Sequence, residues 1–215
     1  MTALLAGATG LIGRELSRHW TGPGPLHLLV RRAGTAHSAT MPLHRVHVVD
    51  FAALPPLPQA DRAFCCLGTT IGAAGSQEAF RGVDHNAVLA FARAAQHAGV
   101  RHFAVVSALG ASARSRTFYN RIKGEMEAEL ATLGFASLVI ARPSLLAGDR
   151  ASLGQPARLG ERLALTLSTP LAAFIPKAWR PIQAAVVARA LLRALDKPVP
   201  GLRVLESAQL QELGA

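Results

Sequence analysis

The stretch from Leu4 to Arg14 reads LLAGATGLIGR, an apolar strand that runs into a glycine-rich turn and then into a helix. Each of its three glycines meets a different structural requirement. Gly7 permits the tight turn, Gly10 lets the backbone approach a pyrophosphate, and Gly13 lets the helix pack closely on the strand. The first N–H groups of the helix lack partners within the helix and lie at the positive end of its dipole. The stretch therefore predicts a strand–turn–helix unit that binds a phosphate-bearing ligand.

Short apolar runs alternate with helical stretches along the rest of the chain. Several runs are continuously apolar, as expected of strands that helices cover on both faces. The alternation predicts an α/β fold with a doubly wound, mostly parallel, Rossmann-like sheet. The predicted strands are Ala3–Ala6, Leu26–Val30, Val46–Val49, Ala63–Cys66, His102–Val106 and Ser137–Ala141, and the predicted helices are Leu11–Trp20, Asp84–Ala98, Tyr119–Leu133 and Ile182–Leu195.

The 215 residues are predicted to form a single domain, because one domain usually takes about 100 to 200 residues. Residues 1–150 carry the alternating pattern and form the expected dinucleotide-binding core, and residues 151–215 a short, less regular C-terminal segment on the substrate side. Within that segment, residues 163–176 are apolar but broken by Pro170, so they fall short of the ~20 residues of a spanning helix. A pocket wall or a subunit contact is favoured over a membrane surface.

Composition narrows the functional classes. Half of the residues are hydrophobic and 17% are charged, which excludes a disordered or collagen-like chain. The net charge is +10, but the basic residues are scattered and aromatic residues make up 5%, so nucleic-acid binding is not expected. The two cysteines, Cys65 and Cys66, are adjacent, and the eight histidines lack metal-ligand spacing, so neither a disulfide framework nor a metal site is expected. A reducing, cytoplasmic location with no secretory signal or transmembrane segment is the prediction.

Three polar residues stand out as candidates for chemistry. Tyr119 is the single tyrosine of the chain, and Lys123, one of three lysines, follows it at a spacing that puts both side chains on one face of a helix. Ser107 ends the predicted fifth strand and therefore lies at the carboxyl edge of the sheet, where ligands bind in such folds. These residues are expected to share one site.

With these residues the chain resembles the atypical, GATGxxG branch of the short-chain dehydrogenase/reductase superfamily. The segment His85–Phe103 (HNAVLAFARAAQHAGVRHF) is similar to the fourth helix and fifth strand of that branch. CCLGTT at Cys65–Thr70, KGE at 123–125 and RP at 142–143 are most similar to the small Tat-interacting-protein-like, NADPH-binding oxidoreductases. The resemblance extends over most of the chain.

The resemblance implies a role for each of the three candidates. Tyr119 would be the general acid or base, Ser107 would hydrogen-bond the substrate oxygen, and Lys123 would bind the nicotinamide ribose. A tyrosine hydroxyl ordinarily has a pKa of about 10, so proton transfer near neutral pH needs a nearby positive charge such as a lysine ammonium. The asparagine that completes a catalytic tetrad in many relatives has no clear counterpart, because the matching helix has Asp84 and Asn86. Neither is assigned a catalytic role.

The cofactor is predicted to be NADP(H) in preference to NAD. In the dinucleotide fold an acidic residue at the end of the second strand binds the ribose 2′-hydroxyl, whereas arginine there accommodates a 2′-phosphate. The second strand ends in Val30-Arg31-Arg32, with no acidic residue. The residues expected to contact the cofactor are Gly7, Ala8, Thr9, Gly10, Leu11, Ile12, Gly13, Arg31, Arg32, Asp50, Phe51, Leu67, Gly68, Lys123, Arg142 and Ser144.

The predicted function is an NADP(H)-dependent oxidoreductase that acts on a small carbonyl or alcohol by hydride transfer. The alternative is a non-catalytic NADPH-binding regulator or redox sensor. Ser107, Tyr119 and Lys123 favour the enzyme, because a sensor needs no proton donor, whereas the short C-terminal segment favours the sensor. The sequence does not determine the substrate, the direction of reaction or the oligomeric state. A homodimer is one of the states that it allows.

Overall fold

A computed structural model describes residues 1–32, 41–147, 176 and 178–215. Its main sheet has seven strands in the order β3-β2-β1-β4-β5-β6-β9, and each neighbouring pair is parallel. The order reverses between β1 and β4, which confirms the predicted doubly wound α/β fold. The strands are β1 (Ala3–Ala6), β2 (Leu26–Val30), β3 (His44–Val48), β4 (Arg62–Cys65), β5 (His102–Val106), β6 (Ser137–Arg142) and β9 (Gly201–Glu206), with a small second sheet of β7 (Leu146–Ala147) and β8 (Ile182–Gln183).

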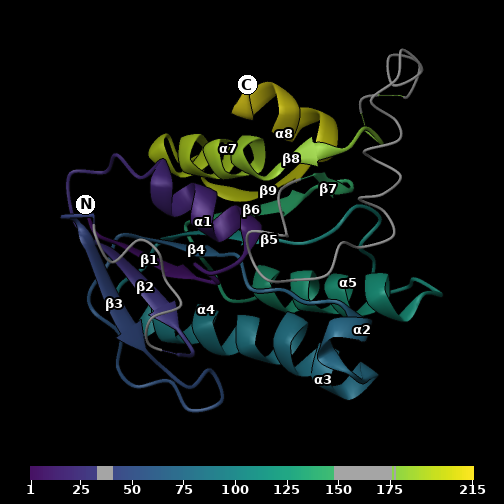
Figure 1. The fold of residues 1–215 in the computed structure, drawn as a ribbon, viewed down its shortest axis with the longest axis horizontal. Helices are drawn as coiled ribbons and strands as arrows, with labels where there is room; N and C mark the ends of the chain where they lie inside the picture. Colours follow the sequence, from purple (N-terminus) through teal and green to yellow (C-terminus); the bar gives the residue numbers. More distant parts are fainter. Residues whose placement is uncertain (33–40, 148–175, 177) are drawn as a thin grey trace.

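Helices cover both faces of the sheet (Figure 1). Helices α1, α7 and α8 lie on one face, and α2 to α5 lie on the other. The second of these layers contains a π-helical turn, which runs directly into α4. The helices are α1 (Leu11–Arg18), α2 (Ile71–Ala74), α3 (Gln77–Arg81), the π-helical turn (Gly82–Ala87), α4 (Val88–His97), α5 (Phe118–Ala131), α7 (Ala184–Asp196) and α8 (Ser207–Gly214).

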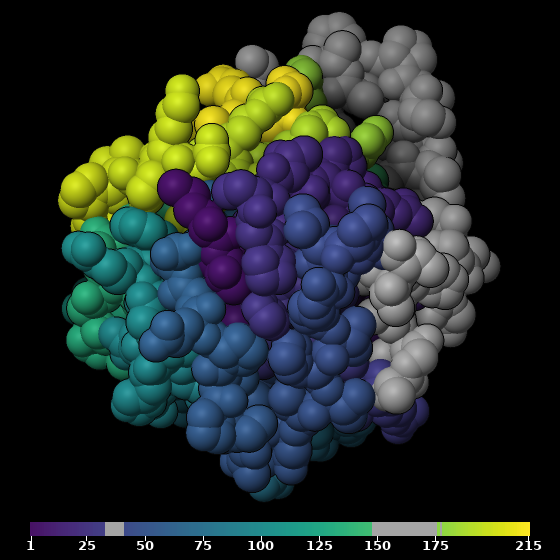
Figure 2. Space-filling model, turned by 90° about the vertical axis from the view of Figure 1, so that its left-hand side faces the viewer, coloured from purple at the N-terminus to yellow at the C-terminus, as the bar shows by residue number. Residues whose placement is uncertain are grey.

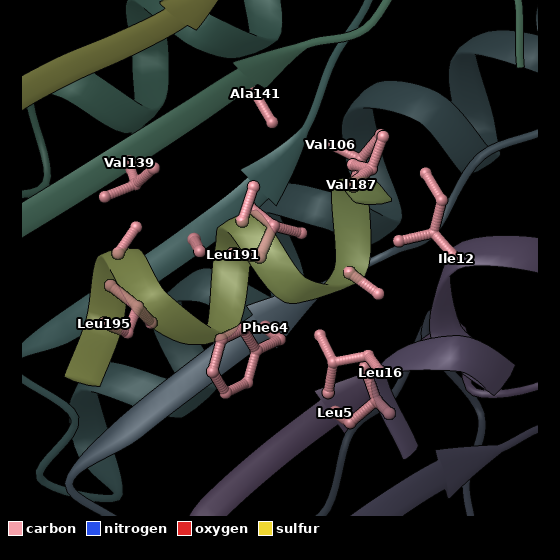
Figure 3. Close-up of a cluster of buried hydrophobic side chains, with 14 of the residues drawn as sticks. Leu5, Ile12, Leu16, Phe64, Val106, Val139, Ala141, Val187, Leu191 and Leu195 are labelled. Atoms are coloured by element: carbon pink, nitrogen blue, oxygen red, sulfur yellow. The ribbon is translucent and has the colours of Figure 1, made fainter. Parts of the chain in front are cut away.

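Each face of the sheet carries its own apolar core. On the α1 and α7 side, Val187, Leu191 and Leu195 of α7 lie against Phe64 of β4 and Leu16 of α1 (Figure 3). The other core packs α4 and α5 on the opposite sheet face. The central strands are buried on both sides, which explains why β1 is apolar throughout and why β4 and β5 are apolar after their first residue. Seen from the β3 edge, the N-terminal third of the chain lies below the C-terminal helices (Figure 2).

The predicted element boundaries agree with the structure to within two residues at most ends. Strands β1, β2 and β5 have the predicted bounds. Strand β3 begins at His44 rather than Val46, because all five of its residues pair with β2 although the first two are polar. The first four residues of the helix predicted over Asp84–Ala98 belong to the π-helical turn, so α4 itself starts at Val88. The helix predicted over Ile182–Leu195 starts at Ala184, after the β8 bridge.

The C-terminal segment supplies more regular structure than its sequence pattern indicated. Strand β9 pairs along its whole length with β6, and α7 and α8 pack on the sheet and on each other. The sequence pattern missed β9 because it is an edge strand whose first three residues, GLR, are exposed. The apolar residues 163–175 lie outside the described part of the chain. No helix in the described ranges is long and apolar enough to cross a membrane.

Candidate active site

The glycine turn after β1 is constrained by backbone contacts. Gly7 has a φ of +85°, and a Cβ there would lie 2.4 Å from the carbonyl carbon of Cys66. A Cβ on Gly13 would lie 2.1 Å from the carbonyl oxygen of Gly7, as expected for close packing of helix on strand. A Cβ on Gly10 would meet one atom at 3.5 Å, an ordinary contact. Packing within the chain therefore requires Gly7 and Gly13, whereas Gly10 leaves open space on the outer side of the turn.

A cavity of about 840 Å³ lies at the carboxyl ends of strands β1 to β4. This volume is within the range of small-molecule sites, and the position beside the switch point between β1 and β4 is where doubly wound sheets bind ligands. Eight of the predicted cofactor residues line it: Gly7, Thr9, Gly10, Arg31, Asp50, Phe51, Leu67 and Gly68.

Other predicted cofactor residues have their side chains elsewhere. Ala8 and Ile12 are buried in the core on the α7 side, so these two could offer a ligand only their backbone at the start of α1. Leu11 is partly buried and packs against the same core. Both arginines after β2 belong to the described residues, and of the two, Arg31 lines the cavity whereas Arg32 does not.

Arg142 and Ser144 follow the same pattern. The Arg142 guanidinium donates to Glu127 Oε1 at 3.1 Å and to Glu206 Oε1 at 3.0 Å. The Ser144 hydroxyl donates to the Arg180 carbonyl and accepts a hydrogen bond from the Ser207 hydroxyl at 2.9 Å. These side chains connect β6 to the helices and the edge strand around it, and they are not among the described residues that line the cavity.

The outer wall of the cavity was not predicted. Small residues of α2, α3, the π-helical turn and the start of α4 form it, and the polar Asn86 lies among them. Alanine and glycine there leave room that larger side chains would fill. The available signal is the density of small residues in IGAAGSQEAFRGV at residues 71–83. The wall residues are Ala73, Ala74, Ala79, Gly82, Val83, Asn86, Ala87 and Ala90.

Ser107 and Lys123 lie together at the end of β5. Ser107 is 4% exposed, and its hydroxyl makes no hydrogen bond with any described residue. Its backbone N–H donates to the carbonyl of Ala141 at 2.7 Å, which fixes the strand exit. Lys123 Nζ, also buried, donates to the carbonyl oxygen of Val106 at 3.4 Å, one residue before Ser107. A buried hydroxyl without a protein partner fits a position that faces a ligand.

Asp84 forms a buried ion pair with Lys123. Its Oδ1 lies 2.8 Å from Lys123 Nζ, and its Oδ2 accepts a hydrogen bond from the backbone N–H of Thr69 at 2.8 Å. Burial lowers the pKa of Lys123, but the Asp84 carboxylate, with a smaller effect from Tyr119, outweighs it, so the net shift is upward. The sequence assigned no role to Asp84 and did not predict its contact with Lys123.

Tyr119 lies at the start of α5, one turn before Lys123. Its side chain is half-buried, and its ring lies 5.2 Å from the Phe80 ring of α3, centroid to centroid. The helix thus presents the tyrosine toward α3 and the lysine toward the π-helical turn and β5.

Gly124 lets the loop between Ser107 and Tyr119 pack on α5. A Cβ on Gly124 would lie 2.1 Å from the carbonyl carbon of Ser112 and 2.2 Å from the nitrogen of Ala113. We expect Gly124→Ala to lower the free energy of unfolding by about 1–3 kcal/mol, the usual cost of overpacking, as measured by urea denaturation. The control is Gly72→Ala in α2, where a Cβ meets nothing within 4 Å. Equal stability of the two variants would contradict the loop contact.

Comparison with known proteins gives relatives over most of the chain. No protein-family model matches the sequence. Protein HTATIP2 of Rattus norvegicus is 33% identical over 224 residues, covering 99% of this chain and 89% of that protein. Protein FMP52, mitochondrial, of Eremothecium gossypii is 37% identical over 158 residues, covering 70% of this chain and 68% of that protein.

A solved structure shares the fold at low identity. MoeE5 in complex with UDP-glucuronic acid and NAD superimposes with a TM-score of 0.72 and 19% identity, covering 96% of this chain and 76% of that one. This structural likeness shows the fold, whereas the sequence similarity over most of the chain shows the family. The chain belongs to the family of the HTATIP2 and FMP52 proteins, an atypical branch of the short-chain dehydrogenase/reductase superfamily with an NAD(P)-binding Rossmann fold.

Proposed function

We propose that the protein is an NADP(H)-dependent oxidoreductase that interconverts a small carbonyl and its alcohol. The observation that carries the proposal is the buried Ser107 hydroxyl, which has no partner among the described residues and lies beside Lys123 at the strand edge that also bears the glycine turn. A non-catalytic NADPH-binding protein does not require a hydroxyl that faces a substrate at this position.

The residues at this edge fit a dinucleotide. Gly10 and the start of α1 would hold the pyrophosphate, since the turn leaves open space there and the helix offers free N–H groups. Asp50 and Phe51 would contact the adenine, Leu67 and Gly68 a ribose of the cofactor, and the four residues line the same cavity. Lys123 would bind the nicotinamide ribose. When bound, the cofactor would supply or accept the hydride.

The protein's own residues would handle the proton. The Tyr119 hydroxyl would give a proton to the substrate oxygen during reduction and take it back during oxidation. The Ser107 hydroxyl would hydrogen-bond that oxygen and orient the carbonyl. The family membership and the 33% identity to HTATIP2 support an NAD(P)-linked activity, and the geometry around Ser107 supports a carbonyl or alcohol substrate.

The adjacent thiols support a reducing compartment, and we propose the cytoplasm. Cys65 and Cys66 are both free, and Cys66 lines the cofactor cavity, where oxidation would disturb the site. The names of the FMP52 relatives assign those proteins to mitochondria, so fractionation of cells that express the protein decides between the two locations.

The choice of NADPH over NADH is expected to depend on Arg31. A charge-assisted hydrogen bond to the 2′-phosphate is worth about 1.5–3 kcal/mol, or about 10- to 150-fold in affinity. Arg31→Ala should weaken NADPH by that factor and leave NADH almost unchanged, as measured by calorimetric titration of both cofactors. Arg32→Ala is the matched control, because Arg32 does not line the cavity in the described structure.

Salt dependence separates a direct contact from general attraction by a protein of net charge +10. Long-range attraction between exposed charges is screened at higher ionic strength, whereas a close contact is screened less. The NADPH preference should therefore persist in high salt. Equal losses for both cofactors, a wild-type preference for NADH, or an equal effect of Arg32→Ala would contradict the role of Arg31.

A further inference from the structure

Asp84 connects the candidate catalytic lysine to the wall of the cofactor cavity. Its carboxylate is fully buried, with Lys123 Nζ 2.8 Å from one oxygen and the Thr69 N–H 2.8 Å from the other. Thr69 lines the cavity, and a Cβ on its neighbour Gly68 would lie 3.4 Å from Asp84 Oδ1 and 3.9 Å from Lys123 Nζ. One side chain therefore contacts both the ammonium and the backbone against which a cofactor would lie.

The π-helical turn Gly82–Ala87 determines which residues face inward. A π turn is rare, shifts the register of the residues that follow and is frequent at functional sites. In this turn Asp84 and His85 are buried, whereas Asn86 lines the cavity. The turn lies between α3 and α4 and packs on α5, the helix that carries Lys123.

Stability alone does not explain a buried ion pair at this place. Removing an ammonium and a carboxylate from water costs free energy that their attraction often fails to recover, and an apolar pair of similar volume is often as stable or more so. A buried lysine without a partner tends to lose its proton. The pair is thus better explained by a need for a charged, fixed lysine at the cavity.

We propose that Asp84 is a positioning residue that keeps Lys123 as an ammonium and fixes it against the Gly68–Thr69 backbone, ready for the ribose of a dinucleotide. The inference rests on the proposed function, in which Lys123 binds the cofactor. It gives a role to a residue that the sequence left without one.

The groups around Lys123 give the proposal a pH signature. Asp84 faces it from the π-helical turn, Tyr119 from its own helix and Cys65 from β4. Burial raises the pKa of Cys65 to about 12, so this thiol is neutral near pH 8. Without the Asp84 carboxylate Lys123 loses the ion-pair partner that raises its pKa, and burial then lowers the pKa of Lys123. Above that pKa the charged fraction of the lysine falls about tenfold per pH unit.

The test is the pH dependence of NADPH binding in wild type, Asp84→Asn and Asp84→Glu, followed by cofactor fluorescence between about pH 6 and 9. Asp84→Asn should bind NADPH nearly as tightly as wild type at the acid end of this range. At the alkaline end it should bind NADPH about 10-fold more weakly, which corresponds to a tenfold fall in the charged fraction of Lys123. Asp84→Glu, which keeps the charge, should restore most of the wild-type profile. Asp196→Asn, at the exposed end of α7, is the control for loss of a carboxylate. A uniform loss across the pH range would mean a structural role only and would overturn the proposal.

A second measurement uses the protein without cofactor. The chain has three lysines, at 123, 177 and 197, so the Nζ resonance of Lys123 is assigned by its absence in Lys123→Met. In wild type it should not titrate below about pH 10, close to the ordinary lysine value, whereas in Asp84→Asn it should titrate at lower pH. If Lys123 titrated in Asp84→Asn as it does in wild type, the inference would be contradicted. If the protein bound no NADPH, that result would count against the proposed function alone, because this titration is measured without cofactor.

If Asp84→Asn does not fold, the double variant Asp84→Asn/Lys123→Met removes both charges together and should fold. It should bind NADPH more weakly than wild type, with no extra weakening at alkaline pH relative to Asp196→Asn. Wild-type NADPH affinity in the double variant would show that the pair does not serve the cofactor and would overturn the proposal.

Discussion

Tyr119→Phe is expected to lower turnover by roughly 10²- to 10⁴-fold, the usual contribution of general acid–base catalysis, and to leave the dissociation constant of NADPH almost unchanged. The substitution removes only the hydroxyl that exchanges a proton with the substrate oxygen. The aromatic ring, whose centroid lies 5.2 Å from that of Phe80, keeps its packing. NADPH binding by fluorescence and turnover on a panel of small aldehydes, ketones and alcohols measure the two effects separately.

The outcomes of this experiment separate the enzyme from the regulator. A Tyr119→Phe protein as active as wild type would remove the catalytic assignment of the tyrosine. A wild-type protein that binds NADPH but is inert on every substrate would favour the non-catalytic regulator. Whether residues 151–175 of the C-terminal segment leave an open pocket beside Tyr119 and Ser107 falls outside the described part of the chain, so turnover is the decisive measurement.

The fold could be predicted where local sequence and burial agree. Six of the seven strands of the main sheet were found, because strands covered on both faces are short apolar runs between turns. Strand β9 was missed, since its exposed first half, GLR, carries no apolar run and its place beside β6 depends on contacts distant in sequence. The glycine turn was predictable down to Gly7 and Gly13, because their constraints come from backbone only a few residues away or on the adjoining strand.

The residues of the candidate site also differ in whether local sequence could predict them. Tyr119 and Lys123 could be paired from their spacing, since one helix carries both. The partner of Lys123 could not be predicted in this way. Asp84 contacts Lys123 from a π-helical turn, and the 3.6-residue period of an α-helix gives no sign of such a turn. The available signal was the single carboxylate in the stretch FRGVDHNA, which directly precedes VLAFARAA.

Arg142 shows that a family motif does not determine the direction of a side chain. The predicted contact between Arg142 and the cofactor stays a prediction, but the direction of its side chain depends on neighbours that the motif does not contain. The hydrogen bonds that Arg142 donates to Glu127, helped by the one that it donates to Glu206, raise the pKa of Arg142 above its usual value despite burial. The guanidinium thus joins β6 to α5 and to the end of β9.

Arg142→Met is therefore expected to lower the free energy of unfolding by about 3–5 kcal/mol, the cost of breaking a buried ion pair by removing one partner. Glu127, whose side chain is 7% exposed, would keep a charge with no cation against it, whereas Glu206 at 43% exposure can turn to water. Urea denaturation measures the loss. For a chain of this size each kcal/mol lowers the melting temperature by about 2–4 °C.

Two controls identify the buried carboxylate as the cause. The double variant Arg142→Met/Glu127→Leu removes both charges and should recover most of the stability, because apolar replacement of a buried pair is often neutral or favourable. Arg18→Met breaks the exposed pair with Glu15 and should cost less than about 1 kcal/mol. If Arg142→Met were as stable as wild type but bound NADPH much more weakly, the guanidinium would serve the cofactor after all. Loss of stability with unchanged NADPH affinity in the folded protein, the expected result, makes Arg142 a structural tie between β6, α5 and β9.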